Sequence, residues 1–125
     1  MAAAYRRGVD ALLDGRLDDA ARDLAAPAAA GMPGAPLALA KLHLQREEGE
    51  PARRHLAALL ADPPGDPGMH AYLRLLSAVA AGMAGDPDAA LADLEDAMRL
   101  DPRVEVAARA LRRRLEKRRP PVLRF

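Results

Sequence analysis

The side chains that could perform catalysis or bind a metal are few in this chain, and their spacing favours neither activity. The three histidines, His43, His55 and His70, fall in three separate predicted helices. Zinc ligands have to converge in space and commonly lie three or four residues apart on one helix. We therefore expect His43 to pack between helices, the other two histidines to lie at the surface, and no metal site to form.

The densest acidic cluster, Glu47, Glu48 and Glu50, surrounds Gly49 in a predicted turn. Acid–base catalysis needs one carboxyl group buried so that its pKa rises, whereas a turn leaves all three carboxylates in solvent. Ser77, the only serine, lies in an apolar helix without the glycines of a nucleophile elbow. No glycine-rich loop follows a strand to bind phosphate. The pattern predicts a noncatalytic protein that uses no cofactor.

Composition narrows the fold class of this single-domain-sized chain. Half of the 125 residues are apolar but only Tyr5, Tyr72 and Phe125 are aromatic, so leucine and alanine must form the core. Such a core favours close helix–helix packing. Cysteine is absent, which excludes disulfides and thiolate ligands. The first residues lack a signal-peptide core and no apolar run approaches the roughly 20 residues of a membrane span, so we expect a cytoplasmic protein.

The charges are unevenly distributed along the chain. Residues 1–102 contain 10 basic and 16 acidic side chains, whereas residues 103–125 contain 9 basic and 2 acidic ones. The protein therefore combines an acidic body with a basic end. Its abundance of alanine, arginine, aspartate and proline is typical of a GC-rich bacterial genome.

Acidic residue–proline pairs mark four helix starts. An acidic side chain accepts hydrogen bonds from the free amides of a first helical turn, and proline fits the first position because its missing N–H would be unpaired there. The pairs are Glu50–Pro51, Asp66–Pro67, Asp86–Pro87 and Asp101–Pro102. With the glycine-containing turns, they predict seven helices at 2–14, 17–30, 35–47, 51–61, 67–83, 87–100 and 103–118. Two consecutive prolines then predict an extended tail over 119–125.

A set of five residues occurs twice, with a constant shift of 70 residues. Gly15, Asp18, Ala20, Asp23 and Leu24 return as Gly85, Asp88, Ala90, Asp93 and Leu94. This shift is close to two periods of about 34 residues, the length of one helix–turn–helix unit in a repeat family. A repeated helical pair cannot bury its apolar face alone, so it must stack on its neighbours.

The repeated pattern resembles tetratricopeptide repeats. The last copy matches the small, turn and apolar positions of that family with Ala78, Gly85, Ala90, Leu94, Ala97, Met98 and Pro102. The first copy supplies Gly8, Gly15, Ala20 and Leu24. A middle copy keeps Ala40, Leu44, Ala52 and Leu56, with its turn glycine displaced to Gly49.

The resemblance implies an all-α fold, an α-solenoid of about three helix–turn–helix repeats. The repeats would span residues 1–34, 35–66 and 67–102, followed by a capping helix over 103–118 and the tail over 119–125. A nonrepetitive helical bundle rich in alanine is the alternative.

The resemblance also implies a binding groove, because the inner helix of each pair lines a concave surface in this family. The corresponding residues are Tyr5, Val9, Leu12, Leu37, Lys41, Leu44, Tyr72, Leu76 and Val79. The clamp of cationic and polar residues with which some relatives bind acidic chaperone tails is missing. The implied groove is largely apolar, with Lys41 as one charged residue, and would suit an apolar or amphipathic protein segment. The alternative is that the stack itself buries several of these side chains.

The basic end is a second candidate surface. Its residues Arg109, Arg112, Arg113, Lys117 and Arg118 would contact phosphates or an anionic membrane through charge. No aromatic residues that stack on bases accompany them. The alternative is a solubilising capping helix whose cations favour its C-terminal end. We therefore expect a small adaptor or chaperone-like protein that binds another protein, with charge-driven binding of nucleic acid or membrane, and self-association, as the alternatives.

Overall fold

The computed structural model describes residues 1–118, which form seven α-helices and one short 3-10 helix. Their bounds are α1 (Ala2–Leu13), α2 (Leu17–Ala29), α3 (Ala35–Gln45), α4 (Gly49–Ala61), α5 (Pro67–Met83), α6 (Pro87–Leu100), η1 (Pro102–Val104) and α7 (Glu105–Arg118). No strand occurs among residues 1–118. The tail predicted over 119–125 lies outside the described residues.

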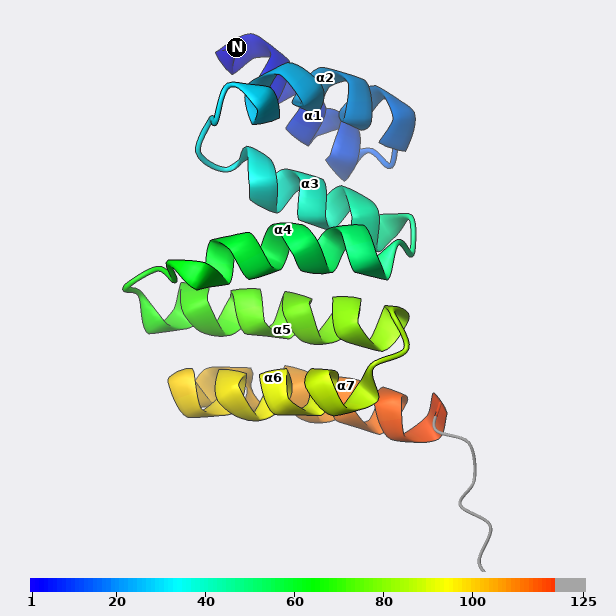
Figure 1. Cartoon of the computed structure of the whole chain (residues 1–125), viewed down its shortest axis with the longest axis vertical. Coiled ribbons are helices and arrows are strands. Elements are labelled where there is room, and N and C mark those ends of the chain that lie inside the picture. Colours follow the sequence, from blue (N-terminus) through cyan, green and yellow to red (C-terminus); the bar gives the residue numbers. More distant parts are fainter. Residues whose placement is uncertain (119–125) are drawn as a thin grey trace, which may run out of the picture.

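The helices stack in a row from the N-terminal to the C-terminal end of the molecule (Figure 1). Each helix packs against the next one in the chain, which produces the pairs α1–α2, α3–α4 and α5–α6, with α7 against the last pair. In addition α1 contacts α3, Lys41 of α3 lies over the ring of Tyr72 of α5, and α5 contacts α7. The odd-numbered helices therefore share one flank of the row, the odd-helix flank. The all-α solenoid with a C-terminal capping helix is confirmed.

The first and last pairs close their turns in the same way. Gly15 and Gly85 have φ angles of 77° and 80°, a left-handed conformation that glycine adopts without steric cost. The amide of the residue after each glycine donates to the carbonyl of Ala11 at 2.8 Å or of Ala81 at 2.9 Å. The residues that recur in the sequence therefore form the same local structure twice.

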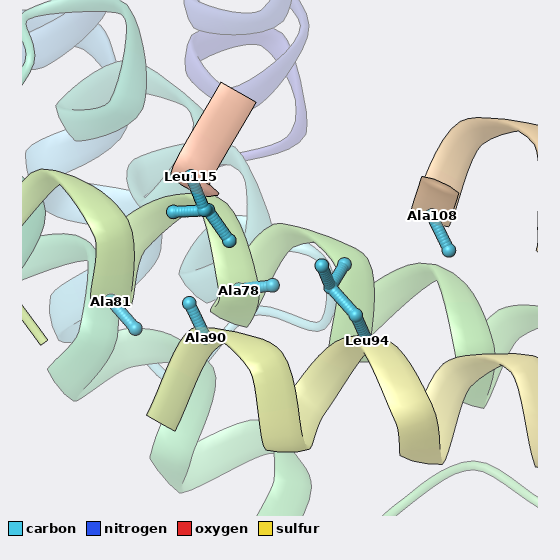
Figure 2. Packing of buried hydrophobic residues seen from close by; sticks show 6 residues of the cluster. All are labelled: Ala78, Ala81, Ala90, Leu94, Ala108 and Leu115. Atoms are coloured by element: carbon cyan, nitrogen blue, oxygen red, sulfur yellow. The ribbon is translucent and has the colours of Figure 1, made fainter. Parts of the chain in front are cut away.

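Small residues allow the paired helices to approach closely. A Cβ atom on Gly8 of α1 would lie only 2.6 Å from Cγ of Leu24, which is fully buried on α2. In the last pair, Ala78 of α5 lies beside the equivalent Leu94 of α6, and Leu115 of α7 packs over the same cluster (Figure 2). The core consists of alanine and leucine, as the composition predicted.

The middle turn, between α3 and α4, departs from the expected pattern. Its left-handed position is occupied by Glu47, with φ of 59°, and the amide of Glu48 donates to the carbonyl of His43 at 2.8 Å. The prediction that Gly49 serves as the turn glycine is wrong. Gly49 is the first residue of α4, where a Cβ atom would lie 2.7 Å from the carbonyl oxygen of Ala80 on α5.

Three of the four predicted acidic caps form as expected. Asp66 accepts from the amide of Met69 at 2.9 Å, and Asp86 accepts from the amide of Ala89 at 3.2 Å. The cap expected from Glu50 is wrong, because α4 already begins at Gly49.

The third cap, Asp101, forms at the predicted position but caps η1, and α7 begins only at Glu105. Asp101 is 7% exposed and accepts from the backbone amide of Arg103 at 3.0 Å, at the start of η1. The same carboxylate accepts from the guanidinium of Arg103, and these hydrogen bonds lower the pKa of Asp101. This pair fixes the junction between α6 and α7.

Candidate functional site

A hollow of about 150 Å³ lies between α1 and α3 on the odd-helix flank. It brings together five of the nine residues predicted for the groove, which are Tyr5, Val9, Leu12, Leu37 and Lys41. Leu13, Gly34 and Ala38 complete its wall. We call it the α1–α3 hollow.

Helical spacing explains why these side chains meet. Tyr5, Val9 and Leu13 follow one another at four-residue intervals and therefore lie on one face of α1. Gly34, with φ of 90°, precedes α3, and a Cβ atom there would lie 2.6 Å from the hydroxyl of Tyr5. Glycine thus lets the phenol ring lie against the turn. Leu13 remains 80% exposed at the edge of this hollow.

Lys41 connects the hollow with the next odd-numbered helix. Its Nζ atom lies 5.3 Å from the centre of the Tyr72 ring on α5, within cation–π distance. Tyr72 is 36% exposed, so the ring presents apolar surface beside the hollow. Lys41 forms no ion pair with any of residues 1–118, and its charge therefore lacks a counter-ion on the described surface.

The other predicted groove residues have different surroundings. Leu44 and Leu76 are half-buried and pack against the core cluster around Leu56 and Leu73. Val79 lines a second hollow of about 110 Å³ between α5 and α7. The remaining wall of this α5–α7 hollow consists of Ala78, Gly82, Met83, Leu111, Arg114 and Leu115.

Sequence reasoning missed several wall residues, and only some could have been found. Leu13 continues the four-residue spacing of Tyr5 and Val9, which is a usable signal. Arg114 could not be selected among neighbouring arginines, because its place depends on which face of α7 packs. That face is set by Leu115, whose Cδ2 atom would lie 2.7 Å from a Cβ atom on Gly82.

The two hollows have the same electrostatic character. Each contains one charged side chain in its wall, Lys41 in the α1–α3 hollow and Arg114 in the α5–α7 hollow, and neither wall contains a carboxylate. Like Lys41, Arg114 forms no ion pair within the described part of the chain. Both sites can therefore accept an apolar group together with a negative charge.

The predicted basic patch on α7 is partly neutralised by its own helix. Arg109 pairs with Glu105 at 2.6 Å, and Arg112 pairs with Glu116 at 3.1 Å. Arg113 and Lys117 are exposed and make no ion pair among residues 1–118, whereas the side chain of Arg118 lies outside the described part. Exposed pairs of this kind contribute only about 0.3–0.5 kcal/mol each.

The histidines are arranged differently from the prediction. His43 of α3 packs between helices as expected, but it stacks on His55 of α4 with ring centres 5.5 Å apart, and its Nδ1 atom lies 3.1 Å from Oε1 of Glu48. Burial, followed by the neighbouring His43 and Arg54 charges, lowers the pKa of His55. His55 and His70 are half-buried rather than at the surface. Among the described residues, no group of three or more potential ligands is placed to hold a metal ion.

The remaining candidates for catalysis have ordinary structural partners. Glu47, Glu48 and Glu50 are exposed. The hydroxyl of Ser77 donates to Oδ2 of Asp93 on α6 at 2.7 Å, which holds α5 and α6 together. None of the helices within residues 1–118 has the length and apolarity that crossing a membrane requires.

Comparison with known proteins leaves the chain without a match. No protein-family model, no curated protein and no solved structure matches it.

Proposed function

We propose that the protein is a noncatalytic protein–protein interaction module of the tetratricopeptide type, a small cytoplasmic adaptor or chaperone-like protein. It binds a segment of another protein along the odd-helix flank. The observation that carries this proposal is the α1–α3 hollow, in which residues from two successive helical pairs form one apolar wall. A helical solenoid commonly uses the flank where its repeats line up to hold a partner chain.

The physical properties of this flank support binding of an apolar side chain. Hollows of about 150 Å³ lined by apolar groups can hold a benzene-sized group. Leu13 and Tyr72 extend the apolar surface at its edges and are still accessible to a partner. Full burial of a leucine side chain contributes about 1.5–3 kcal/mol, so contact with Leu13 alone would be measurable.

A matched pair of variants tests the proposal. Leu13→Glu places a charge in the α1–α3 hollow, whereas Val106→Glu places the same charge at an 81% exposed position on α7 that lines neither hollow. A partner captured from the native cell and purified should bind Leu13→Glu at least about ten-fold more weakly than the unmodified protein. It should bind Val106→Glu with unchanged affinity. Equal affinity of all three proteins, measured by titration calorimetry, would contradict the proposal.

Charge-driven binding through α7 is the second candidate, supported by the exposed and unpaired Arg113 and Lys117. Binding of duplex DNA or of vesicles with anionic lipid should then weaken steeply as salt is raised. The double variant Arg113→Ser with Lys117→Ser should abolish it. Binding of a protein segment to the odd-helix flank would be unaffected by the same variant, so the two functions can be separated.

A further inference from the structure

We infer that the segment bound by the odd-helix flank is acidic as well as apolar. It places one aliphatic side chain in each of the two hollows, with carboxylates directed at Lys41 and Arg114. The inference rests on the proposed function and adds the chemistry of the partner.

Lys41 carries a charge that no described residue neutralises. Its ammonium group lies over the Tyr72 ring, at the edge of an apolar wall, and has no carboxylate partner among residues 1–118. Water is partly displaced when a segment covers such a wall, which strengthens the attraction between the cation and an opposite charge. A partner without a negative charge here would cover the cation without compensating it.

Arg114 repeats this arrangement at the other end of the flank. Of the four basic residues from Arg109 to Arg114 in α7, Arg109 and Arg112 are engaged by Glu105 and Glu116, the two acidic residues of that helix. Arg113 and Arg114 are exposed and have no ion-pair partner among residues 1–118, and of these two Arg114 lies in the wall of the α5–α7 hollow. The only charge in this second hollow is therefore again positive and free for a partner.

The absence of carboxylates from both walls contrasts with the rest of the molecule. Residues 1–102 contain 16 acidic and 10 basic side chains, yet none of the acidic ones lines either hollow. A neighbouring hollow at the N-terminal end of α1 contains Arg6 together with Asp10, so its charges balance. Another hollow contains Arg74 and Arg99 together with Asp96, and both arginines are in ion pairs, with Asp93 and Asp96. The α1–α3 and α5–α7 hollows differ from these two in having an unpaired cation and no carboxylate.

The chain itself does not supply a suitable occupant. Its residues 119–125 carry Arg119 and Arg124 and no acidic residue, so their charge repels both hollows. On a second copy, the strongly exposed Leu13 and Val106 are adjacent to Asp14 and Glu105, but both carboxylates are already in ion pairs. We therefore assign the flank to an acidic, apolar segment of a different protein.

Selection from a random decapeptide library displayed on phage tests this assignment. Peptides enriched on the full chain should combine aliphatic residues with aspartate or glutamate. The charge-reversed double variant Lys41→Glu with Arg114→Glu should instead enrich peptides with lysine or arginine, provided that circular dichroism shows it to be folded. Enrichment of apolar peptides without acidic residues would overturn the inference but leave the proposed function standing. Failure to enrich any peptide that depends on Leu13 would contradict both.

Single substitutions make the test quantitative and independent of charge reversal. For a synthetic peptide from the selection, Lys41→Met and Arg114→Met should each weaken binding by about five-fold, the upper range for a partly exposed ion pair. Lys117→Met removes an equal charge from α7 outside the hollow and should leave the affinity unchanged. Equal losses for Lys117→Met and Arg114→Met in fluorescence anisotropy would show that only the overall charge matters, and would overturn the assignment.

Discussion

The middle helical pair and the two outer pairs have the same fold but use different residues at corresponding positions. The left-handed turn position is glycine in the outer pairs, Gly15 and Gly85, and Glu47 in the middle one. The carbonyl that closes the turn belongs to Ala11 and Ala81 in the outer pairs and to His43 in the middle. The middle pair therefore tolerates a strained turn and a bulky imidazole, and it is the pair that packs against another helical pair on both sides.

The polar contact between paired helices differs in the same way. In the last pair, Asp93 of α6 accepts hydrogen bonds from Ser77 and from Arg74 of α5. In the middle pair, the stack of His43 on His55 joins α3 and α4 instead. The middle pair thus depends on a ring contact in which burial lowers the pKa of His55.

The largest loss of stability is expected when a buried leucine is truncated, and its size shows whether the first and middle pairs are equally well packed. Leu24 of α2 and Leu56 of α4 are both fully buried. Leu24→Ala and Leu56→Ala should each lower the free energy of unfolding by about 2–5 kcal/mol, because each leaves a cavity in a packed interface. Denaturant titration measures both. A loss below about 1 kcal/mol for Leu56→Ala alone would show that the middle pair is loosely packed.

A smaller loss is expected where the middle pair touches α5 through Gly49. A Cβ atom in Gly49→Ala would lie 2.7 Å from backbone atoms of Ala80 and Ala84, which cannot move without displacing α5. The free energy of unfolding should fall by about 1–3 kcal/mol. Gly65→Ala is the control, since a Cβ atom there meets no atom within 4 Å. Equal thermal stability of the two variants would contradict the close approach.

A substitution in the turn at Glu47 should raise the free energy of unfolding instead of lowering it. Glu47→Gly removes the clash of a side chain in a left-handed conformation and should raise the free energy of unfolding by about 1 kcal/mol. Gly85→Ala should lower it by a similar amount, because the same conformation then carries a Cβ atom. Glu47→Ala removes the charge but keeps the strain. If it stabilises as much as Glu47→Gly, the gain comes from charge and not from the backbone.

The smallest effect concerns the histidine stack and its pH dependence. Because the pKa of His55 is lowered in the folded state, the unfolded chain binds more protons, and stability falls as the pH drops below the unfolded value of about 6.5. The groups that face His55 are His43, with its partner Glu48, and Arg54. His55→Gln should flatten the slope of unfolding free energy between pH of about 7 and about 5.5. An unchanged slope would show that groups other than His55 cause the pH dependence of the unfolding free energy. Asp101 is not one of them, because its lowered pKa lies below this pH window.

The sequence alone was sufficient for the helical architecture and for part of the candidate site. Proline and aspartate patterns located α5 and α6, since caps and first-turn prolines act locally. The left-handed Glu47 was not predicted, because this conformation normally selects glycine and the nearby Gly49 was taken for the turn residue. The sequence could not identify Arg114 as a wall residue either, because the packed face of α7 depends on the contact of Leu115 with Gly82. The sequence thus predicted features that depend on neighbouring residues, such as helix caps. It did not predict contacts between helices that are distant in the chain.

The most direct test of the odd-helix flank as the binding surface is a nuclear magnetic resonance titration of the isotope-labelled protein with an acidic, apolar peptide from the selection. The amide signals of Val9, Lys41, Tyr72 and Val79, on three successive odd-numbered helices, should shift. Signals of α2 and α4 should stay in place. Shifts confined to the exposed face of α7, or spread over the even-numbered helices, would contradict this binding surface.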